Sequence, residues 1–507
     1  MVKKADIMDN GEKVLEEFRA YMRGTAEYRR VNGLLFWDSM LRVPPGGAQG
    51  RARTRAFMAK EQFARETGGE VRRFLRLLEP REAELSDFDR ALLRLCRRDY
   101  DINASIPVEL FEEYERIKAE SMAGWDLAYK ANNYTLFAPH LKRIMETQKK
   151  ICPYYTQGSG NYDKLIQLYE EDVDTALLDS LFAELKETIL PLVQKITAQK
   201  RPRPEFLSRP VPAAVQRRFC EQICRRIGLD EDKAMLYETT HPFSCVINTG
   251  DIRFSTRYRE EDFQSSLFST LHEGGHSIYS LNIPETLGET ILGEGASPAF
   301  HEGQSRFYEN VIGRSREFIS YIYPDIEKFL GPHIGSVGPD ELYRGFNHVA
   351  PSFIRTEADE LTYTLHIILR YELERACIDQ DMAVEDLPEA WNKKMKEYFN
   401  LEVSQDRLGL LQDIQWSAGR IGAFVSYALG NVYNAQIFHT IKKDMDFAGA
   451  LSRGDFAAIN GYLKEKVHCY SALYPPRRQL RMISGSDPDS VFFTRYLVEK
   501  YTALYDL

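Results

Sequence analysis

The strongest chemical signal in the sequence is His272-Glu273-Gly274-Gly275-His276, which matches the pattern H-E-x-x-H. On a helix, residues four apart share one face, so both imidazoles can bind one metal ion. Glu273 then lies where it can take a proton from a water molecule that the metal activates. The alternative interpretation is a pair of surface histidines without a metal.

A third metal ligand is expected downstream, because a catalytic zinc ion usually takes three protein ligands and keeps one position open. Ser297-Pro298 predicts a helix start, since serine caps helices and proline is favoured at the first helical position. His301 and Glu302 both fall near the start of that helix. Either side chain can reach the metal if the two helices pack antiparallel, and the residue types leave this choice open.

The residues around the histidine pair predict a helix. Apolar residues recur along it at helical spacing, at Phe263, Leu267, Leu271 and Ile278. Gly274 and Gly275 are each unfavourable within a helix by about 1 kcal/mol relative to alanine. They indicate that something approaches closely there, either a neighbouring helix or a substrate.

Most of the remaining chain repeats its apolar residues with a helical period. Helices are predicted over 10–23, 52–79, 107–131, 175–199, 212–227, 340–348, 358–377, 386–400 and 491–505. Prolines between 201 and 212 interrupt the pattern and predict a linker. Alternating apolar and polar residues on both sides of Asn248-Thr249-Gly250 predict a β-hairpin over 243–255.

Composition excludes several classes of protein. With 66 Lys+Arg and 75 Asp+Glu among 507 residues, the net charge of −9 favours neither nucleic acid nor an anionic membrane as partner. A hydrophobic fraction of 43% excludes disorder over the whole chain. The first residues contain no apolar run typical of a signal peptide or a membrane span, and the seven scattered cysteines form no disulfide framework. We therefore expect a cytoplasmic protein.

At these motifs the sequence resembles the carboxypeptidase Taq family of metallocarboxypeptidases. The family's HPF, D-x-R-x-T, H-E-x-x-H, H-E-(S/G)-Q and Q-D-x-H-W motifs correspond to His241-Pro242-Phe243, 251–255, 272–276, 301–304 and 412–416. Further similarity at 35–38, 162–163, 178–179, 351–363, 429–431 and 496–505 extends the resemblance over nearly the whole chain. In the family, the glutamate of H-E-(S/G)-Q is the third metal ligand, which selects Glu302.

The sequence also departs from the family pattern. Ser255 replaces a threonine and keeps the hydroxyl, whereas Gln415 replaces the histidine of Q-D-x-H-W. Glutamine donates hydrogen bonds but cannot carry a proton or a positive charge. The residues 423–426 differ as well, although Tyr427 keeps its place. We single out His301 and Gln415 as candidates that act beside the metal without binding it.

The resemblance implies a mostly α-helical metallopeptidase with a deep groove between helical lobes and a small β-sheet beside the active-site helix. We expect one peptidase domain over 1–507, in which the proline-rich linker separates an N-terminal helical lobe, 1–200, from a catalytic lobe, 213–507. The implied activity releases single residues from peptide C-termini with broad side-chain tolerance, in a homodimer that holds one divalent ion per chain, zinc or else cobalt. His272, His276 and Glu302 would hold the ion, with Glu273 as general base and Tyr427 stabilising the oxyanion.

An exopeptidase of this kind must also recognise a free α-carboxylate, which the planar fork of arginine binds bidentately. Arg253 in the predicted hairpin and Arg355 in the 351–363 segment are the candidates, and a structural ion pair is the alternative for each. An exposed edge of the hairpin could in addition pair with an extended peptide. Two rival functions remain: a metallo-oligopeptidase or endopeptidase with the same chemistry, and a helical binding protein that lost activity through Gln415.

Overall fold

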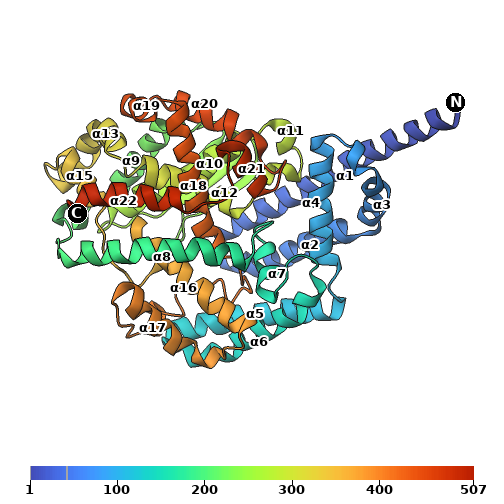
Figure 1. The fold of residues 1–507 in the computed structure, drawn as a ribbon, viewed down its shortest axis with the longest axis horizontal. Coiled ribbons are helices and arrows are strands. Elements are labelled where there is room, and N and C mark those ends of the chain that lie inside the picture. Colours follow the sequence, from blue (N-terminus) through green and yellow to red (C-terminus); the bar gives the residue numbers. More distant parts are fainter. Residues whose placement is uncertain (1, 42–43) are drawn as a thin grey trace.

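The computed structural model describes residues 2–41 and 44–507, and helices dominate it (Figure 1). The helices are α1 (Val2–Met40), α2 (Ala48–Thr67), α3 (Gly69–Leu78), α4 (Asp87–Ala104), α5 (Val108–Ala131), α6 (Ala138–Ile151), α7 (Asn161–Gln167), α8 (Thr175–Ala198), α9 (Ala213–Arg226), α10 (Phe263–Leu281), α11 (Glu285–Gly288), α12 (Pro298–Arg306), α13 (Arg316–Phe329), α14 (Gly331–Ile334), α15 (Pro339–Phe346), α16 (Glu360–Asp379), α17 (Leu387–Phe399), α18 (Val425–Asp444), α19 (Phe447–Arg453), α20 (Phe456–Lys466), α21 (Pro476–Ser484) and α22 (Val491–Tyr505). The strands are β1 (Ala234–Glu238), β2 (Ser244–Asn248) and β3 (Asp251–Thr256). The mostly helical fold class with a small sheet is confirmed.

The predicted helices are all present, with two differences in extent. The segment 52–79 is divided between α2 and α3, because Gly68 adopts an extended conformation with φ −74° and ψ 179°. Helix α1 runs over 39 residues and exceeds the prediction of 10–23 at both ends. Within the described residues, no helix has the length and apolarity needed to cross a membrane.

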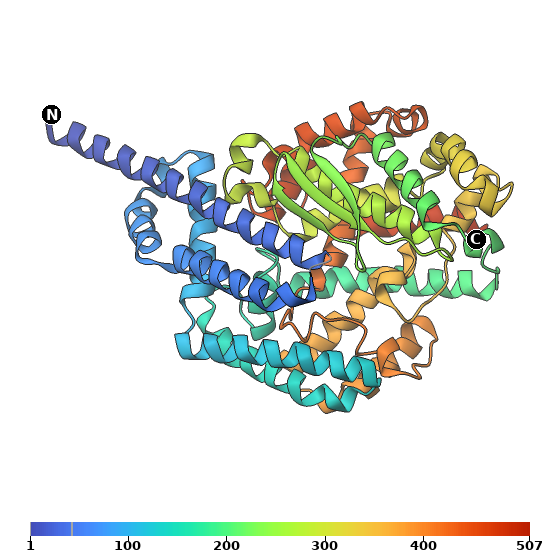
Figure 2. The ribbon, with the colours of Figure 1, turned by 180° about the vertical axis from the view of Figure 1, so that it is seen from behind.

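The sheet contains the predicted hairpin and one further strand. β2 and β3 pair antiparallel, and β1 pairs in parallel with β3, which gives the order β1-β3-β2. Helix α10 packs against β3, and α1 runs alongside the sheet by β2 (Figure 2). Trp37 of α1 lies 5.1 Å from the ring of Tyr237 and 4.9 Å from that of Phe243. The family-like segments 35–38 and 241–243 therefore meet in space.

Two apolar cores hold the helices together. The larger core draws on residues from both sides of the 201–212 linker, including Leu185 of α8 and Leu497 of α22. These two helices lie side by side (Figure 1). The smaller core joins α1, α3 and α4 to the segment around Leu292. The division into lobes at 1–200 and 213–507 stays a prediction.

Helices α10 and α12 pack antiparallel, since His272 lies beside Glu309 while the later residue His276 lies beside the earlier His301. Gly275 permits this close contact. A Cβ atom there would lie 2.7 Å from the carbonyl oxygen of Gln304 in α12. The close neighbour that the glycine pair predicted is therefore another helix.

Gly275→Ala should lower the thermal midpoint of unfolding. Alanine improves helix propensity by about 1 kcal/mol, but the added methyl group meets backbone, and overpacking costs about 1–3 kcal/mol. The matched control is Gly461→Ala in α20, where no atom lies within 4 Å of the added Cβ. That variant should unfold at the parent temperature or slightly above it. Equal midpoints for the two variants would show that α10 and α12 can separate without cost.

Candidate metal centre

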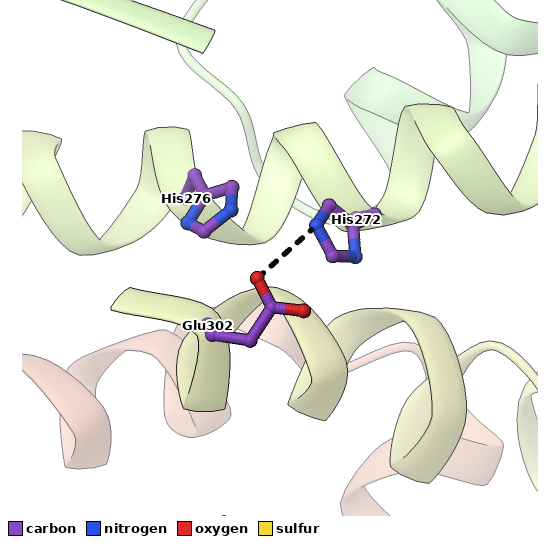
Figure 3. A group of neighbouring side chains, drawn as sticks. All are labelled: His272, His276 and Glu302. Carbon is purple, nitrogen blue, oxygen red and sulfur yellow. Dashed lines mark ion pairs between the residues drawn. The ribbon is translucent and has the colours of Figure 1, made fainter. Parts of the chain in front are cut away.

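Three potential metal ligands converge between α10 and α12. The ligand atoms of His272, His276 and Glu302 all lie within 4.8 Å of one another. Figure 3 shows the two imidazoles on one face of α10, with the carboxylate directed towards them from α12. His272 Nε2 and Glu302 Oε2 are 3.8 Å apart, which is too far for a hydrogen bond and leaves space for a cation between them.

In His272 and Glu302, the side-chain atom that faces away from the cluster is held by a neighbouring residue. His272 Nδ1 lies 2.9 Å from Glu309 Oε2, which fixes the ring with Nε2 towards the cluster. Arg306 Nε donates to Glu302 Oε1 at 2.8 Å, which leaves Oε2 for the cluster. This arrangement of donors and their supports fits a divalent ion. His276 differs, because its buried Nδ1 has no hydrogen-bond partner among the described residues.

Glu309 was not predicted from the sequence. It lies on a π-helical turn, Phe307–Ile312, that continues α12. The available signal was its spacing, since a residue seven positions after Glu302 returns to nearly the same helical face. A charged residue inside the apolar run Phe307–Ile312 was a second hint. Neither signal identifies the nitrogen of His272 that Glu309 contacts.

The buried charges around the cluster shape its pKa values. Arg306 bridges Glu302 and Glu309, and Arg314 lies 3.5 Å from the second oxygen of Glu309. Burial would raise the pKa of Glu309, but Arg306, the hydrogen bond to His272 and Arg314 hold it well below the ordinary value. For the His272 imidazole the directions are reversed. Burial alone would lower its pKa, whereas the negative charges of Glu302 and Glu309 raise it.

Glu273, the predicted general base, is buried between α10 and the sheet. Burial raises its pKa to about 7, and His272 and the hydroxyl of Ser244 on β2 partly offset this effect. A carboxylate in a site of this kind is a stronger base than one in water. The strand β2 therefore lies next to the residue that is expected to move the proton.

His301 is turned away from the ligand cluster. Its Nε2 lies 3.2 Å from the carbonyl oxygen of Glu294, and its ring packs against the rings of His276 at 5.5 Å and Tyr279 at 4.7 Å. Burial lowers the pKa of His301 to about 4. Beside His301 lies a cavity of about 400 Å³ whose walls include Arg29 of α1.

Arg355 lies in a buried network that reaches the metal centre. It donates to Asp413 Oδ1 from Nη2 at 2.9 Å and to the hydroxyl of Tyr363 from Nη1 at 3.0 Å. Arg370 donates to the other oxygen of the same Asp413. The ring of Tyr363 lies 3.9 Å from the guanidinium of Arg306, which holds Glu302. Tyr363 thus joins the Arg355 network to the ligand cluster.

The segment 412–416 builds the surroundings of Arg355. Gln412 Oε1 accepts from the backbone N–H of Arg355 at 2.9 Å, next to the pair that Asp413 makes. Trp416 donates to the buried Glu374 at 2.6 Å and anchors the segment. The side chain of Gln415 is partly exposed and makes no hydrogen bond within the described chain.

The remaining two candidates differ in their surroundings. Tyr427, at the start of α18, is partly buried, and its ring centre lies 5.0 Å from the Arg355 guanidinium. Arg253, on the central strand β3, is bound bidentately by Asp251 at 2.9 and 2.7 Å. Ser255, two residues later, accepts from the backbone N–H of Phe243 and bonds to Thr239. Its hydroxyl therefore has a structural role.

Gly430 of α18 lies directly against the third candidate ligand. An added Cβ at this position would come within 2.9 Å of the Glu302 Cβ and 3.0 Å of the Ala299 carbonyl oxygen. The family-like segment 429–431 therefore forms the surface on which Glu302 rests.

The chain matches a family model described as "Carboxypeptidase Taq (M32) metallopeptidase" over residues 17–501. It is 36% identical to carboxypeptidase 1 of Bacillus subtilis, over 97% of this chain and 98% of that protein. It is 33% identical to thermostable carboxypeptidase 1 of Pyrococcus furiosus, over 94% and 97% of the two chains. The crystal structure of the M32 carboxypeptidase from Deinococcus radiodurans superposes with a TM-score of 0.93 at 31% identity. The superposition covers 98% of this chain and 100% of that chain.

Glu309→Ala should weaken metal binding by about tenfold to a hundredfold, because His272 loses the carboxylate that orients its ring. Competition with a chromophoric chelator measures the dissociation constant for zinc. The matched control is Asp325→Ala, which removes another buried carboxylate. Asp325 lies away from the ligand cluster and pairs with Arg226 at a distance of 2.7 Å. The control should reduce stability and keep the parent affinity. Parent-like zinc binding by Glu309→Ala would contradict the orienting role.

Proposed function

The chain belongs to the carboxypeptidase Taq (M32) metallopeptidase family, and from this premise we propose that it releases single residues from the free C-terminus of peptides. His272, His276 and Glu302 hold one divalent ion, and Glu273 is the general base. The observation that carries this proposal is the convergence of these three ligands within 4.8 Å, with Glu273 buried beside them.

When bound, the ion polarises the scissile carbonyl and lowers the pKa of the attacking water. Glu273 takes the proton from that water on its carboxylate and passes it to the nitrogen of the leaving residue. Burial raises the pKa of the Glu273 carboxyl above its ordinary value, which makes the carboxylate a better proton acceptor. Glu309 and Arg306 keep two of the ligands oriented throughout.

Zinc is the proposed metal, with cobalt as the alternative. Two imidazoles and one carboxylate form a ligand set that catalytic zinc commonly uses. The buried charges around the site favour a divalent cation. Arg306 and Arg314 pair with Glu302 and Glu309, whereas Glu273 has no arginine or lysine within ion-pair distance among the described residues. A divalent ion would offset the surplus of negative charge.

Arg355 is the proposed site for the substrate carboxylate. Arg355 and Arg370 share the single carboxylate of Asp413, so one positive charge in this buried network has no acidic partner among the described residues. Arg253, by contrast, is neutralised by its own Asp251. An incoming α-carboxylate would supply the missing negative charge beside Arg355. Recognition of a chain end separates this function from that of an endopeptidase.

Other groups complete the proposed substrate site. The strand β2 is at the edge of the sheet and next to Glu273, so an extended peptide could pair with it over the metal. Tyr427, beside Arg355, is the proposed hydrogen-bond donor to the oxyanion. Gln415 offers a neutral amide where the family has an imidazole. We propose that this amide donates a hydrogen bond and, unlike an imidazole, stays uncharged at every pH. Broad side-chain tolerance and a homodimer are proposed from the family resemblance, and a cytoplasmic location remains a proposal.

Glu273→Gln should keep the metal and the fold but lose nearly all turnover, because an amide cannot accept the proton of the water. Peptide hydrolysis is followed by mass spectrometry, with zinc content measured on the same sample. Undiminished turnover at full zinc occupancy would show that another group is the base. A helical binding protein without activity would give no turnover even in the parent.

The carboxylate site is tested with one peptide and its C-terminally amidated twin. Arg355→Gln should raise KM for the free peptide and reduce the preference for it by about tenfold or more, as expected for loss of a charge-assisted hydrogen bond. Arg253→Gln is the matched control and should keep the preference. The reverse result would assign the carboxylate to Arg253. An enzyme that cleaves both peptides equally well would be an oligopeptidase or endopeptidase.

A further inference from the structure

We propose that Glu170 is a positioning residue for the metal centre: from the loop after α7 it fixes the start of α12 and, through it, the side chain of Glu302. The inference rests on the proposed function, because it takes Glu302 to be a ligand of the ion. It concerns a residue that touches neither the ion nor the substrate.

The contact joins distant parts of the chain. Glu170 lies between α7 and α8, and its Oε1 accepts a hydrogen bond of 2.7 Å from the backbone N–H of Ala299. Pro298 has no N–H, and the N–H of Phe300 is bound by Ser297 Oγ at 3.3 Å. Among the first three helical residues, Glu170 therefore binds the donor that Ser297 leaves free. Most helix caps come from the residue just before the helix, as Ser297 does here.

The position of Glu302 depends on where α12 begins. Glu302 follows Ala299 by three residues, so it lies in the turn whose first N–H Glu170 binds. Two close contacts leave little freedom sideways, with Gly275 of α10 on one side and Gly430 of α18 against the Glu302 Cβ on the other. Movement along or about the helix axis is opposed by the bond at its start. Loss of that bond should therefore displace the carboxylate relative to the two histidines.

Burial of a carboxyl group at this position costs free energy. Glu170 is 0% exposed, and among the described residues no lysine or arginine lies within ion-pair distance of it. Its second oxygen is buried, and no described residue donates a hydrogen bond to it. Burial raises the pKa of Glu170 to about 7, and the hydroxyls of Ser426 and Ser297 and the N–H of Ala299 lower it in part. A buried polar group with such a penalty is expected where it serves a specific geometry.

The competing explanation is that Glu170 only ties its loop to the protein. Such a tie would affect stability and leave metal binding unchanged. The two explanations therefore differ in the dissociation constant for zinc, which can be measured by chelator competition on the full-length protein without any assay of activity.

The test compares Glu170→Ala, which removes the acceptor, with Glu170→Gln, whose side-chain carbonyl can still accept from Ala299. Glu170→Ala should weaken zinc binding by about tenfold or more, whereas Glu170→Gln should stay within about threefold of the parent. The matched control is Asp174→Ala. Asp174 caps α8 by accepting from the N–H of Leu177 at 2.8 Å, so this variant loses a similar helix cap away from the metal centre. It should lower the thermal midpoint and keep the parent affinity for zinc.

Parent-like zinc binding by folded Glu170→Ala would overturn the proposal, and so would a Glu170→Gln variant as weak as Glu170→Ala. If Glu170→Ala does not fold, Glu170→Asp replaces it, because a side chain shorter by one methylene cannot reach Ala299, and the same weakening is expected. Glu302→Ala distinguishes the two proposals. If it loses zinc while Glu170→Ala does not, the ligand assignment stands and only the positioning role fails. If Glu302→Ala keeps the parent affinity, the ligand assignment fails and the positioning role fails with it.

Discussion

The close antiparallel contact between α10 and α12 is the constraint on which the rest of the structure depends. His272 and His276 lie on one helix and Glu302 on the other, so the spacing of the helices sets the spacing of the proposed ligand atoms. Gly275 brings the two backbones within contact distance, and Gly430 brings α18 against the opposite side of α12. Helix α12, which carries Glu302, is thus held between α10 and α18. Larger side chains at these glycines would change the size of the metal site itself.

A second constraint is the alternation of charges through the buried site. His272, Glu309, Arg306 and Glu302 form a sequence of opposite partners, and the ring of Tyr363 continues it towards Arg355. In this way the groups proposed to hold the ion and those proposed to hold the substrate's end are parts of one network. Near the ligand cluster the buried charges of Glu302, Glu309 and Arg306 are tolerated because each has a partner of opposite sign, and removal of one member would leave the next without its partner.

Local sequence patterns predicted the local structure well. The H-E-x-x-H spacing, the Ser297 cap and the turn at Asn248-Thr249-Gly250 specify a helix, a helix start and a hairpin within a few residues, and all three are present. The strand β1 was missed, because it pairs with β3 in parallel, and parallel pairing leaves no turn signal between the two strands. Glu309 was missed since its contact with His272 arises only when α12 docks on α10. The same holds for Asp413, whose sharing between Arg355 and Arg370 decides the charge of their network.

The contact of Gly430 with Glu302 has a consequence for synthesis of the chain. Residues 272–302 leave the ribosome well before α18, so the histidines and the glutamate exist as a sequence before the surface that supports Glu302 does. Until α18 packs against α12, the contact between Gly430 and Glu302 does not exist, and the Glu302 carboxylate lacks that restraint. The ligand geometry is complete only once most of the chain has been made and folded. The order of synthesis therefore places the three proposed ligand residues in the chain before the helix that restrains one of them.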